Sequence, residues 1–252
     1  MEGMDLWAEQ LAGEIEEAVD RLLAQPGDRG LAFSGGIDSS LVAHLAARSG
    51  KTLRLYTVGM IGSPDLAASE KAAGLLGLAG RHALLELGEE EVLAAACRIA
   101  GLIPGATLLE VSFLAPSYLV FERALERTIL TGDGADELFG GYHRYLSMEP
   151  AALASSLNKD VEEMVSGGFS RNQRLAASAG KELLAPYLEP DVVALARRIP
   201  AEMKVHAGER KAVLRQAAAI LGLPPELCAL PKRAAQYGSG IHALLTKRHF
   251  MR

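Results

Sequence analysis

Short apolar runs alternate with amphipathic segments through the first part of this 252-residue chain, and this alternation limits the fold more than any other feature. Apolar runs at 31–33, 52–59, 82–87 and 128–130 have the length of buried strands, and apolar residues recur at helical spacing between them. Strands that alternate with helices form right-handed βαβ units, with a mainly parallel sheet covered on both faces. The pattern predicts an α/β fold with a doubly wound parallel sheet. The helices expected in this part are 5–24, 39–48, 65–77, 89–100 and 113–126.

Beyond Gly141 the strand signals stop and helical patterns separated by Gly and Pro take over. We therefore expect a mostly helical C-terminal half that packs against the edge or mouth of the sheet. The chain is predicted to divide into an N-terminal helix (1–28), an α/β core (29–145) and a helical region that completes the site (146–252). The helices expected in the last region are 149–158, 160–166, 170–180, 190–198, 209–221 and 240–247.

Composition excludes several classes of protein. A formal net charge of −5 gives no general basic field, which disfavours nucleic acid as a partner. Cys97 and Cys228 are the only cysteines and form no CxxC pair, which argues against a zinc site, an iron–sulfur cluster or a disulfide framework. The N-terminus lacks the features of a signal peptide, and Pro104, Glu110 and Pro116 interrupt the most apolar later stretch. A cytoplasmic protein with no membrane association is expected.

The first chemically informative motif is SGGIDSS, 34–40, between the first strand and its helix. Gly35 and Gly36 let backbone amides turn toward a ligand, and a helix N-terminus favours an anion. Asp38 would repel a bare phosphate, so its presence makes sense if it holds a magnesium ion that bridges phosphate oxygens. The motif is neither a Walker A loop nor GxGxxG. The structural alternative is a tight turn whose Ser and Asp residues only cap the helix.

A second glycine-rich turn, TGDGADELFGGYHRY at 131–145, follows the strand at 128–130. Asp133, Asp136 and Glu137 lie within five residues of one another and repel unless they share a cation. A magnesium site formed by Asp38 and Asp136 would supply one. The alternative is an acidic, solvated helix cap.

These two motifs together carry a family resemblance. SGGIDSS resembles the pyrophosphate-binding loop of the N-type ATP pyrophosphatases, the PP-loop superfamily, and TGDGADELFGGY is similar to the signature of its asparagine synthetase branch. Further matching segments at 57–77, 180–200, 211–218 and 230–240 follow in the same order. The resemblance implies a Rossmann-like, adenine nucleotide α-hydrolase-like fold. It also implies an ATP- and Mg²⁺-dependent ligase that adenylates a carboxylate, releases pyrophosphate and lets an amine displace AMP, as in asparagine formation from aspartate.

The resemblance also assigns expected roles to residues at the matching positions. Asp38 and Asp136 would hold Mg²⁺, and Asp133 would act as a general base or contact the substrate amine. Lys232 or Arg233 would stabilise charge near the α-phosphate. The residues expected to bind phosphate are Ser34, Gly35, Gly36, Ser39 and Ser40, and those expected to contact adenosine are Val58, Thr131 and Gly132.

Three positions depart from the family pattern. Residue 2 is Glu2, whereas glutamine-using members carry a catalytic cysteine directly after the initiator methionine, so we expect no glutamine hydrolysis by this chain. Nitrogen would then come from ammonia, a substrate amine or a separate amidotransferase subunit. Asp133 replaces a longer glutamate, and Leu184 stands where an arginine would grip a substrate carboxylate, which puts aspartate in question.

Several alternatives stay open at this stage. Lys211 and Arg215 share a helix face that could reach phosphate or could be solvated. His143, Tyr142 and Tyr145 could line an acceptor pocket or only pack. The rival functions are a PP-loop enzyme that modifies another substrate such as tRNA and a non-catalytic ATP- or AMP-binding subunit. Assembly into a homo-oligomer is also left open.

Overall fold

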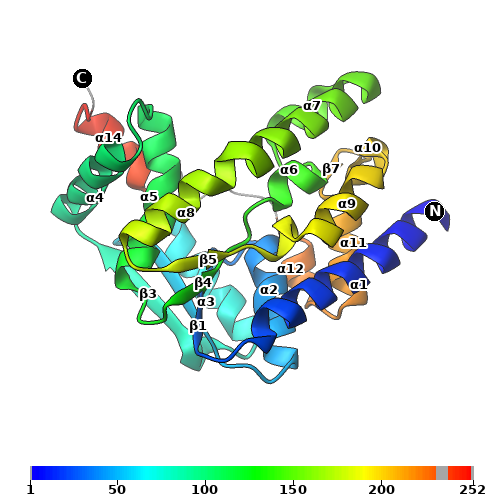
Figure 1. Cartoon of the computed structure of the whole chain (residues 1–252), viewed down its shortest axis with the longest axis horizontal. Helices are drawn as coiled ribbons and strands as arrows, with labels where there is room; N and C mark the ends of the chain where they lie inside the picture. The colour runs from blue at the N-terminus through cyan, green and yellow to red at the C-terminus, as the bar shows by residue number, and fades with distance from the viewer. Residues whose placement is uncertain (1, 231–237, 251–252) are drawn as a thin grey trace.

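The computed structural model describes residues 2–230 and 238–250, and its centre is a five-stranded parallel sheet (Figure 1). The strand order is β3-β2-β1-β4-β5, and every neighbouring pair is parallel. The predicted doubly wound α/β fold is therefore confirmed. The strands are β1 (Arg29–Ala32), β2 (Leu53–Met60), β3 (His82–Leu87), β4 (Thr128–Leu130) and β5 (Glu182–Leu184).

Helices cover both faces of this sheet because the strands are apolar on both faces (Figure 1). Neighbouring residues of one strand enter different cores: Leu55 packs into the core with α1, α2, α9 and α11, and Tyr56 packs into the core with α4, α5, α8 and α14. The helices are α1 (Glu2–Ala24), α2 (Ile37–Arg48), α3 (Pro64–Leu75), α4 (Glu89–Leu102), α5 (Leu108–Arg123), α6 (Ala135–Phe139), α7 (Pro150–Glu163), α8 (Phe169–Ser178), α9 (Pro190–Arg198), α10 (Ala201–Lys204), α11 (Ala212–Ile220), α12 (Pro225–Cys228) and α14 (Ile241–Lys247).

The prediction that strands end after Gly141 is wrong. The short strand β5 pairs with β4, and the antiparallel hairpin β6 (Val205–His206) and β7 (Glu209–Arg210) precedes α11. Both are too short to show a strand period in the sequence. The division of the chain at residue 145 stays a prediction, although β5 joins its sheet from the C-terminal side of that point.

Two helix boundaries also differ from expectation. Helix α5 begins at Leu108 rather than at 113, because Thr107 and Glu110 form a capping box in which each side chain accepts the other's backbone N–H. Helices α7 and α8 are joined by a π-helical turn, Met164–Gly168, so residues 150–178 run as one long irregular helix (Figure 1). Among the described helices, none has the length and apolar character needed to cross a membrane.

The connections place the loops of interest at one edge of the sheet. The chain leaves β1 toward β2 on one side and returns to β4 on the other, so β1 and β4 lie side by side at a topological switch point. Ligands of open parallel sheets bind beyond the carboxyl ends of the strands at such a point. The two predicted motifs, 34–40 and 131–145, follow these two strands directly.

Lys204, the last residue of α10, has a side chain that is almost entirely buried, with 4% of the residue exposed. Burial lowers the pKa of its amine to about 8 from the ordinary 10.5. Between these values the unfolded chain binds more protons, so the free energy of unfolding should rise with pH. Lys204→Met should remove that rise and stabilise the protein at pH 7 by up to about 3 kcal/mol, at about 1.4 kcal/mol per pKa unit. Urea unfolding at pH 7.5 and 10 tests this, with exposed Lys51→Met as control; a parallel pH dependence in Lys204→Met and the parent would contradict it.

Candidate active site

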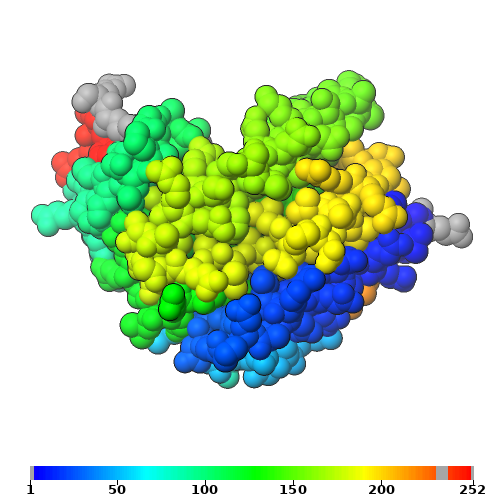
Figure 2. Space-filling model, in the orientation of Figure 1, coloured from blue at the N-terminus to red at the C-terminus, as the bar shows by residue number. Residues whose placement is uncertain are grey.

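A cavity of about 660 Å³ opens beyond the carboxyl ends of β1, β2 and β4, and it is lined by the predicted motifs. Its floor includes Ser34, Asp38 and Ser39 of the first motif and the segment 131–134 of the second. Residues of helix α5, of the π-helical turn and of α8 also line it. The molecule is visibly hollowed between the α4–α5 region and α7 (Figure 2). The fold thus brings together residues that are about one hundred positions apart in the sequence.

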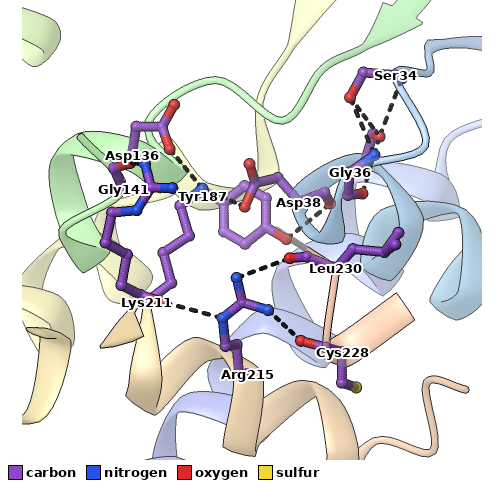
Figure 3. Close-up of polar contacts among 12 residues, drawn as sticks. Ser34, Gly36, Asp38, Asp136, Gly141, Tyr187, Lys211, Arg215, Cys228 and Leu230 are labelled. Carbon is purple, nitrogen blue, oxygen red and sulfur yellow. Dashed lines mark hydrogen bonds and ion pairs between the residues drawn. The ribbon is translucent and has the colours of Figure 1, made fainter. Parts of the chain in front are cut away.

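The loop at 34–40 is held by its own hydroxyl groups. The Ser39 Oγ accepts a hydrogen bond from the Ser34 backbone N–H at 3.2 Å and lies 3.3 Å from the Ser34 Oγ, and Gly36 N–H donates to that Ser34 Oγ at 3.3 Å (Figure 3). Helix α2 begins at Ile37, and its N-cap residue, Gly36, has no side chain that could bond to the amides of the first turn. Its N-terminal amides therefore carry the positive end of the helix dipole toward the cavity, the arrangement that suits an anion.

Gly35 is required by this loop in two ways. Its φ of 72° is left-handed, and an added Cβ would lie 2.8 Å from the Ser69 Cα of helix α3. The neighbouring Gly36 is extended, with a φ of −74°, and acts as the N-cap residue of α2. The two glycines thus serve different purposes: Gly35 permits the close approach to α3, and Gly36 starts the helix.

A buried lysine joins the two predicted metal-binding carboxylates. The Lys211 Nζ lies 2.5 Å from Asp38 Oδ1 and 2.6 Å from Asp136 Oδ1, and Lys211 is only 1% exposed (Figure 3). Asp38 and Asp136 therefore do face one point in space, as the sequence predicts.

The backbone around Lys211 explains how its side chain reaches this point. The β6–β7 hairpin turns through Ala207 and Gly208, both at positive φ, and delivers Lys211 to the start of α11 with a left-handed φ of 59°. Such a conformation is costly for a lysine and persists where surrounding contacts determine it. Arg210 supplies one of them by donating to the Gly141 carbonyl oxygen at 2.9 Å.

The two carboxylates fit a magnesium ion that arrives with a nucleotide better than one bound by protein alone. Among the described residues, no group of three or more His, Cys, Asp or Glu side chains could hold a metal ion. Mg²⁺ commonly uses one or two carboxylates and fills its remaining positions with phosphate oxygens and water. Asp38 and Asp136 already converge on a cation, the Lys211 ammonium, so their geometry suits that arrangement.

The sequence profile of the family described as Asparagine synthase matches residues 10–160 and 146–251 of this chain. The chain belongs to the asparagine synthase family. It is 32% identical to a putative glutamine-hydrolysing asparagine synthetase of Methanocaldococcus jannaschii, covering 86% of this chain and 47% of that one. It is 30% identical to the glutamine-hydrolysing asparagine synthetase of Gallus gallus, covering 89% and 42%. The chain thus spans about half the length of these relatives.

A solved structure of NMN synthetase from Francisella tularensis superimposes with a TM-score of 0.49 at 12% sequence identity, covering 92% of this chain and 76% of that one.

The asparagine synthase signature places a further acid, Asp133, inside the cavity. Asn172 of α8 donates to the Asp133 Oδ2 at 2.7 Å and thereby orients it. Glu137, which follows Asp136, accepts a 2.5 Å hydrogen bond from the Tyr142 hydroxyl. The pKa of the Glu137 carboxyl is raised to about 7, chiefly by burial and also by the nearby Asp136 charge, against the lowering effect of the Tyr142 hydrogen bond.

The residues expected to contact adenosine in this family member also line the cavity. Val58 and Thr131 line it, and Gly132 lies against Asp38, since an added Cβ would be 3.0 Å from the Asp38 Cβ. Pro116, Ser117 and Val120 of α5 also line the cavity.

Not every residue predicted for this asparagine synthase site faces the cavity. Ser34 and Ser39 do, whereas Ser40 is fully buried and its Oγ has no hydrogen-bond partner among the described residues. Phosphate binding by Ser40 stays a prediction, as does phosphate binding by the other residues of the loop. Lys232 and Arg233 lie outside the described residues.

Arg215 is more clearly structural than the sequence suggests. Its guanidinium donates to the carbonyl oxygens of Arg210, Cys228 and Leu230, so it ties the start of α11 to the end of α12 (Figure 3).

Other open alternatives are resolved by position. His143 and Tyr142 line the cavity, while Tyr145 is 1% exposed and packs in a small core with Leu153 and Leu157.

The sequence did not predict the contacts of two residues near the site. Asn172 lies on a helix face with no motif around it. The Tyr187 hydroxyl donates to the Asp38 carbonyl oxygen at 2.9 Å, a contact that was not predicted although PYL at 186–188 matched a family segment.

Proposed function

We propose that this protein is an ATP-dependent, AMP-forming carbon–nitrogen ligase that adenylates a carboxylate. The observation that carries the proposal is the convergence of Asp38 and Asp136, from two separate glycine-rich turns, on one cationic centre at the N-terminus of α2. This arrangement suits the binding of a metal-bound triphosphate chain. Membership of the asparagine synthase family supports the same reaction class.

In the proposed reaction, a carboxylate oxygen attacks the α-phosphorus of ATP, and the bond to the bridging oxygen of pyrophosphate breaks. An amine nitrogen then attacks the carbonyl carbon of the acyl-adenylate, the carbon–oxygen bond to AMP breaks, and the nitrogen loses a proton to solvent. The products are an amide, AMP and pyrophosphate. When bound, Mg²⁺ would neutralise charge on the phosphate oxygens.

The residues of the chain contribute mainly by positioning and by charge. The α2 amides and the hydroxyls of Ser34 and Ser39 would orient the outer phosphates, and Lys211 would stabilise the negative charge that develops on pyrophosphate. Asp133, held by Asn172, would contact the amine. The asparagine-forming reaction, from aspartate with ammonia or with nitrogen from a separate amidotransferase subunit, is the first member of this reaction class to test.

The nucleotide products test the reaction class. The protein is incubated with ATP and Mg²⁺ and a panel of carboxylates and amines that includes aspartate and ammonia, and products are separated by chromatography. AMP with pyrophosphate is expected, whereas ADP with phosphate would overturn the proposal. Binding of ATP or AMP without turnover under every condition would favour a non-catalytic subunit, and turnover only with added tRNA would favour a PP-loop enzyme of that kind.

Asp38→Asn is expected to reduce pyrophosphate release at least 100-fold, since a single misplaced group at the reacting centre can cost this much. The amide keeps the size of the side chain and can still accept from Lys211, but it lacks the charge that attracts Mg²⁺. Initial rates of pyrophosphate release against Mg²⁺ concentration measure the effect. Asp20→Asn, at an exposed position of α1, is the matched control; unchanged release in Asp38→Asn would remove Asp38 from the metal site.

A further inference from the structure

A second, smaller cavity of about 220 Å³ adjoins the 660 Å³ cavity, in which we propose that the nucleotide binds and which we call the nucleotide cavity. The smaller cavity lies beside α5 and the π-helical turn. The two cavities share several lining residues, so they form one continuous space. We call the smaller part the acceptor compartment. We define it by Phe113, Leu114, Glu137, Tyr142, Met164 and Asn172, all of which also line the larger cavity.

One side of the acceptor compartment is apolar. Phe113 is 50% exposed and Leu114 lies beside it on α5, while Met164 faces them from the π-helical turn. A Cβ at Gly168 would lie 2.8 Å from the Met164 Sδ, so the turn packs closely against this side chain. π-Helical turns inside helices often occur at functional sites. An exposed phenylalanine inside a cleft offers contact area to a ligand with an apolar body.

The cationic side chains around the compartment are already paired with acids. The Arg144 guanidinium bonds to Asp160 at 2.5 Å and stacks on the Tyr142 ring at 4.4 Å from its centroid. Arg171 pairs with Glu110 at 2.9 Å. A second substrate carboxylate would therefore have to displace one of these pairs, among the described residues, to find a guanidinium partner.

The acidic side of the compartment, unlike its cationic side chains, offers a carboxylate to which an amine can bind. Glu137 lines both cavities, and Tyr142 is the one side chain that hydrogen-bonds to it among the described residues. Asp133, the neighbouring acid, also lines the nucleotide cavity and repels a carboxylate placed between them. An amine can donate to a carboxylate that accepts from only one hydroxyl.

We propose that the acceptor compartment binds the nitrogen donor of the reaction, and that this donor is an organic primary amine with an apolar body rather than a second carboxylate-bearing molecule. The ammonium or amine end lies at Glu137, and the apolar body lies against Phe113, Leu114 and Met164. This inference rests on the proposed function for its role in catalysis. The recognition of the amine itself rests only on the compartment.

Direct binding tests the recognition without any turnover. Benzylamine and benzoate, which share a ring and differ in the sign of their charge, are titrated into the full-length protein by calorimetry at pH 8. Benzylamine is expected to bind at least tenfold more tightly than benzoate, a difference of about 1.4 kcal/mol. Equal or tighter binding of benzoate would overturn the proposal.

Two variants locate the binding site. Phe113→Ala and Glu137→Gln should each weaken benzylamine binding at least fivefold, while Leu125→Ala, an exposed apolar residue outside the compartment, should leave it within twofold. Phe113→Ala keeps the test valid if Glu137→Gln does not fold. Benzylamine affinity that changes less than twofold in Phe113→Ala would place the amine elsewhere and refute the inference.

ATP–pyrophosphate exchange with a panel of carboxylates, run without any amine, separates this inference from the proposed function. Exchange without benzylamine binding would support the ligase activity and refute the amine-binding role of the acceptor compartment. Benzylamine binding without exchange would support amine binding in the compartment and refute the ligase activity.

Discussion

Replacing Lys211 by methionine is expected to abolish pyrophosphate release and to lower the free energy of unfolding by about 3–5 kcal/mol, the cost of removing one partner from a buried ion pair. Methionine preserves most of the volume of the side chain, so loss of the charge is the main change. Asp38 and Asp136 would then face each other with no cation from Lys211 between them. Urea unfolding in the absence of Mg²⁺ measures the stability, and initial rates with ATP measure the activity.

Two further measurements sharpen this test. If Asp38 and Asp136 form a cation site, Mg²⁺ should restore more stability to Lys211→Met than to the parent protein. Adding Asp136→Asn should also recover part of the lost stability, because it removes the repulsion. Lys159→Met, at an exposed lysine of α7, is the control. A Lys211→Met protein as stable and active as the parent would show that the bridge between the two carboxylates is without consequence.

The strands that could be predicted are those that are long enough or buried enough to leave a recognisable apolar run in the sequence. The run HALLEL gives β3 with the bounds that the structure has, and TIL gives β4. β5 is three residues long, and its backbone pairing with β4 leaves no period in the sequence. Helix α5 begins five residues earlier than predicted because Thr107 and Glu110 cap its start. The prediction relied on apolar spacing and did not use this capping-box pattern.

The candidate site was predictable where its residues lie in strand-to-helix loops and hidden where they lie on helices. Asp38 and Asp136 follow strands that end at the same edge, so topology alone brings them together. Lys211 comes from a distant hairpin, and its spacing from Arg215 fits a solvated helix face as well as a buried one. Only tertiary packing shows that Lys211 is buried between two acids while Arg215 holds backbone carbonyl groups.

The same packing makes the space beside Lys211 unusually restrictive. Gly141 passes so close to the lysine and to Asp136 that a Cβ there would lie 1.8 Å from Asp136 Oδ1 and 2.4 Å from Lys211 Cε. Gly141 is not among the residues with positive φ, so an added methyl group meets a steric conflict rather than a backbone one. Both obstructing atoms belong to side chains that are tied to each other by the ion pair, so relief requires the pair to move.

Gly141→Ala is therefore expected to leave the protein folded, with a stability loss of about 1–3 kcal/mol for overpacking, and to reduce pyrophosphate release at least 100-fold through displacement of Lys211 and Asp136. Gly74→Ala, inside helix α3 with no atom within 4 Å of its new Cβ, is the matched control and should be neutral or slightly stabilising. Urea unfolding and pyrophosphate release on the two variants, side by side, separate the local effect from the general effect of a glycine substitution. Activity in Gly141→Ala within a few-fold of the parent would mean that the Lys211 bridge tolerates movement, and the proposed role of its geometry in pyrophosphate release would have to be given up.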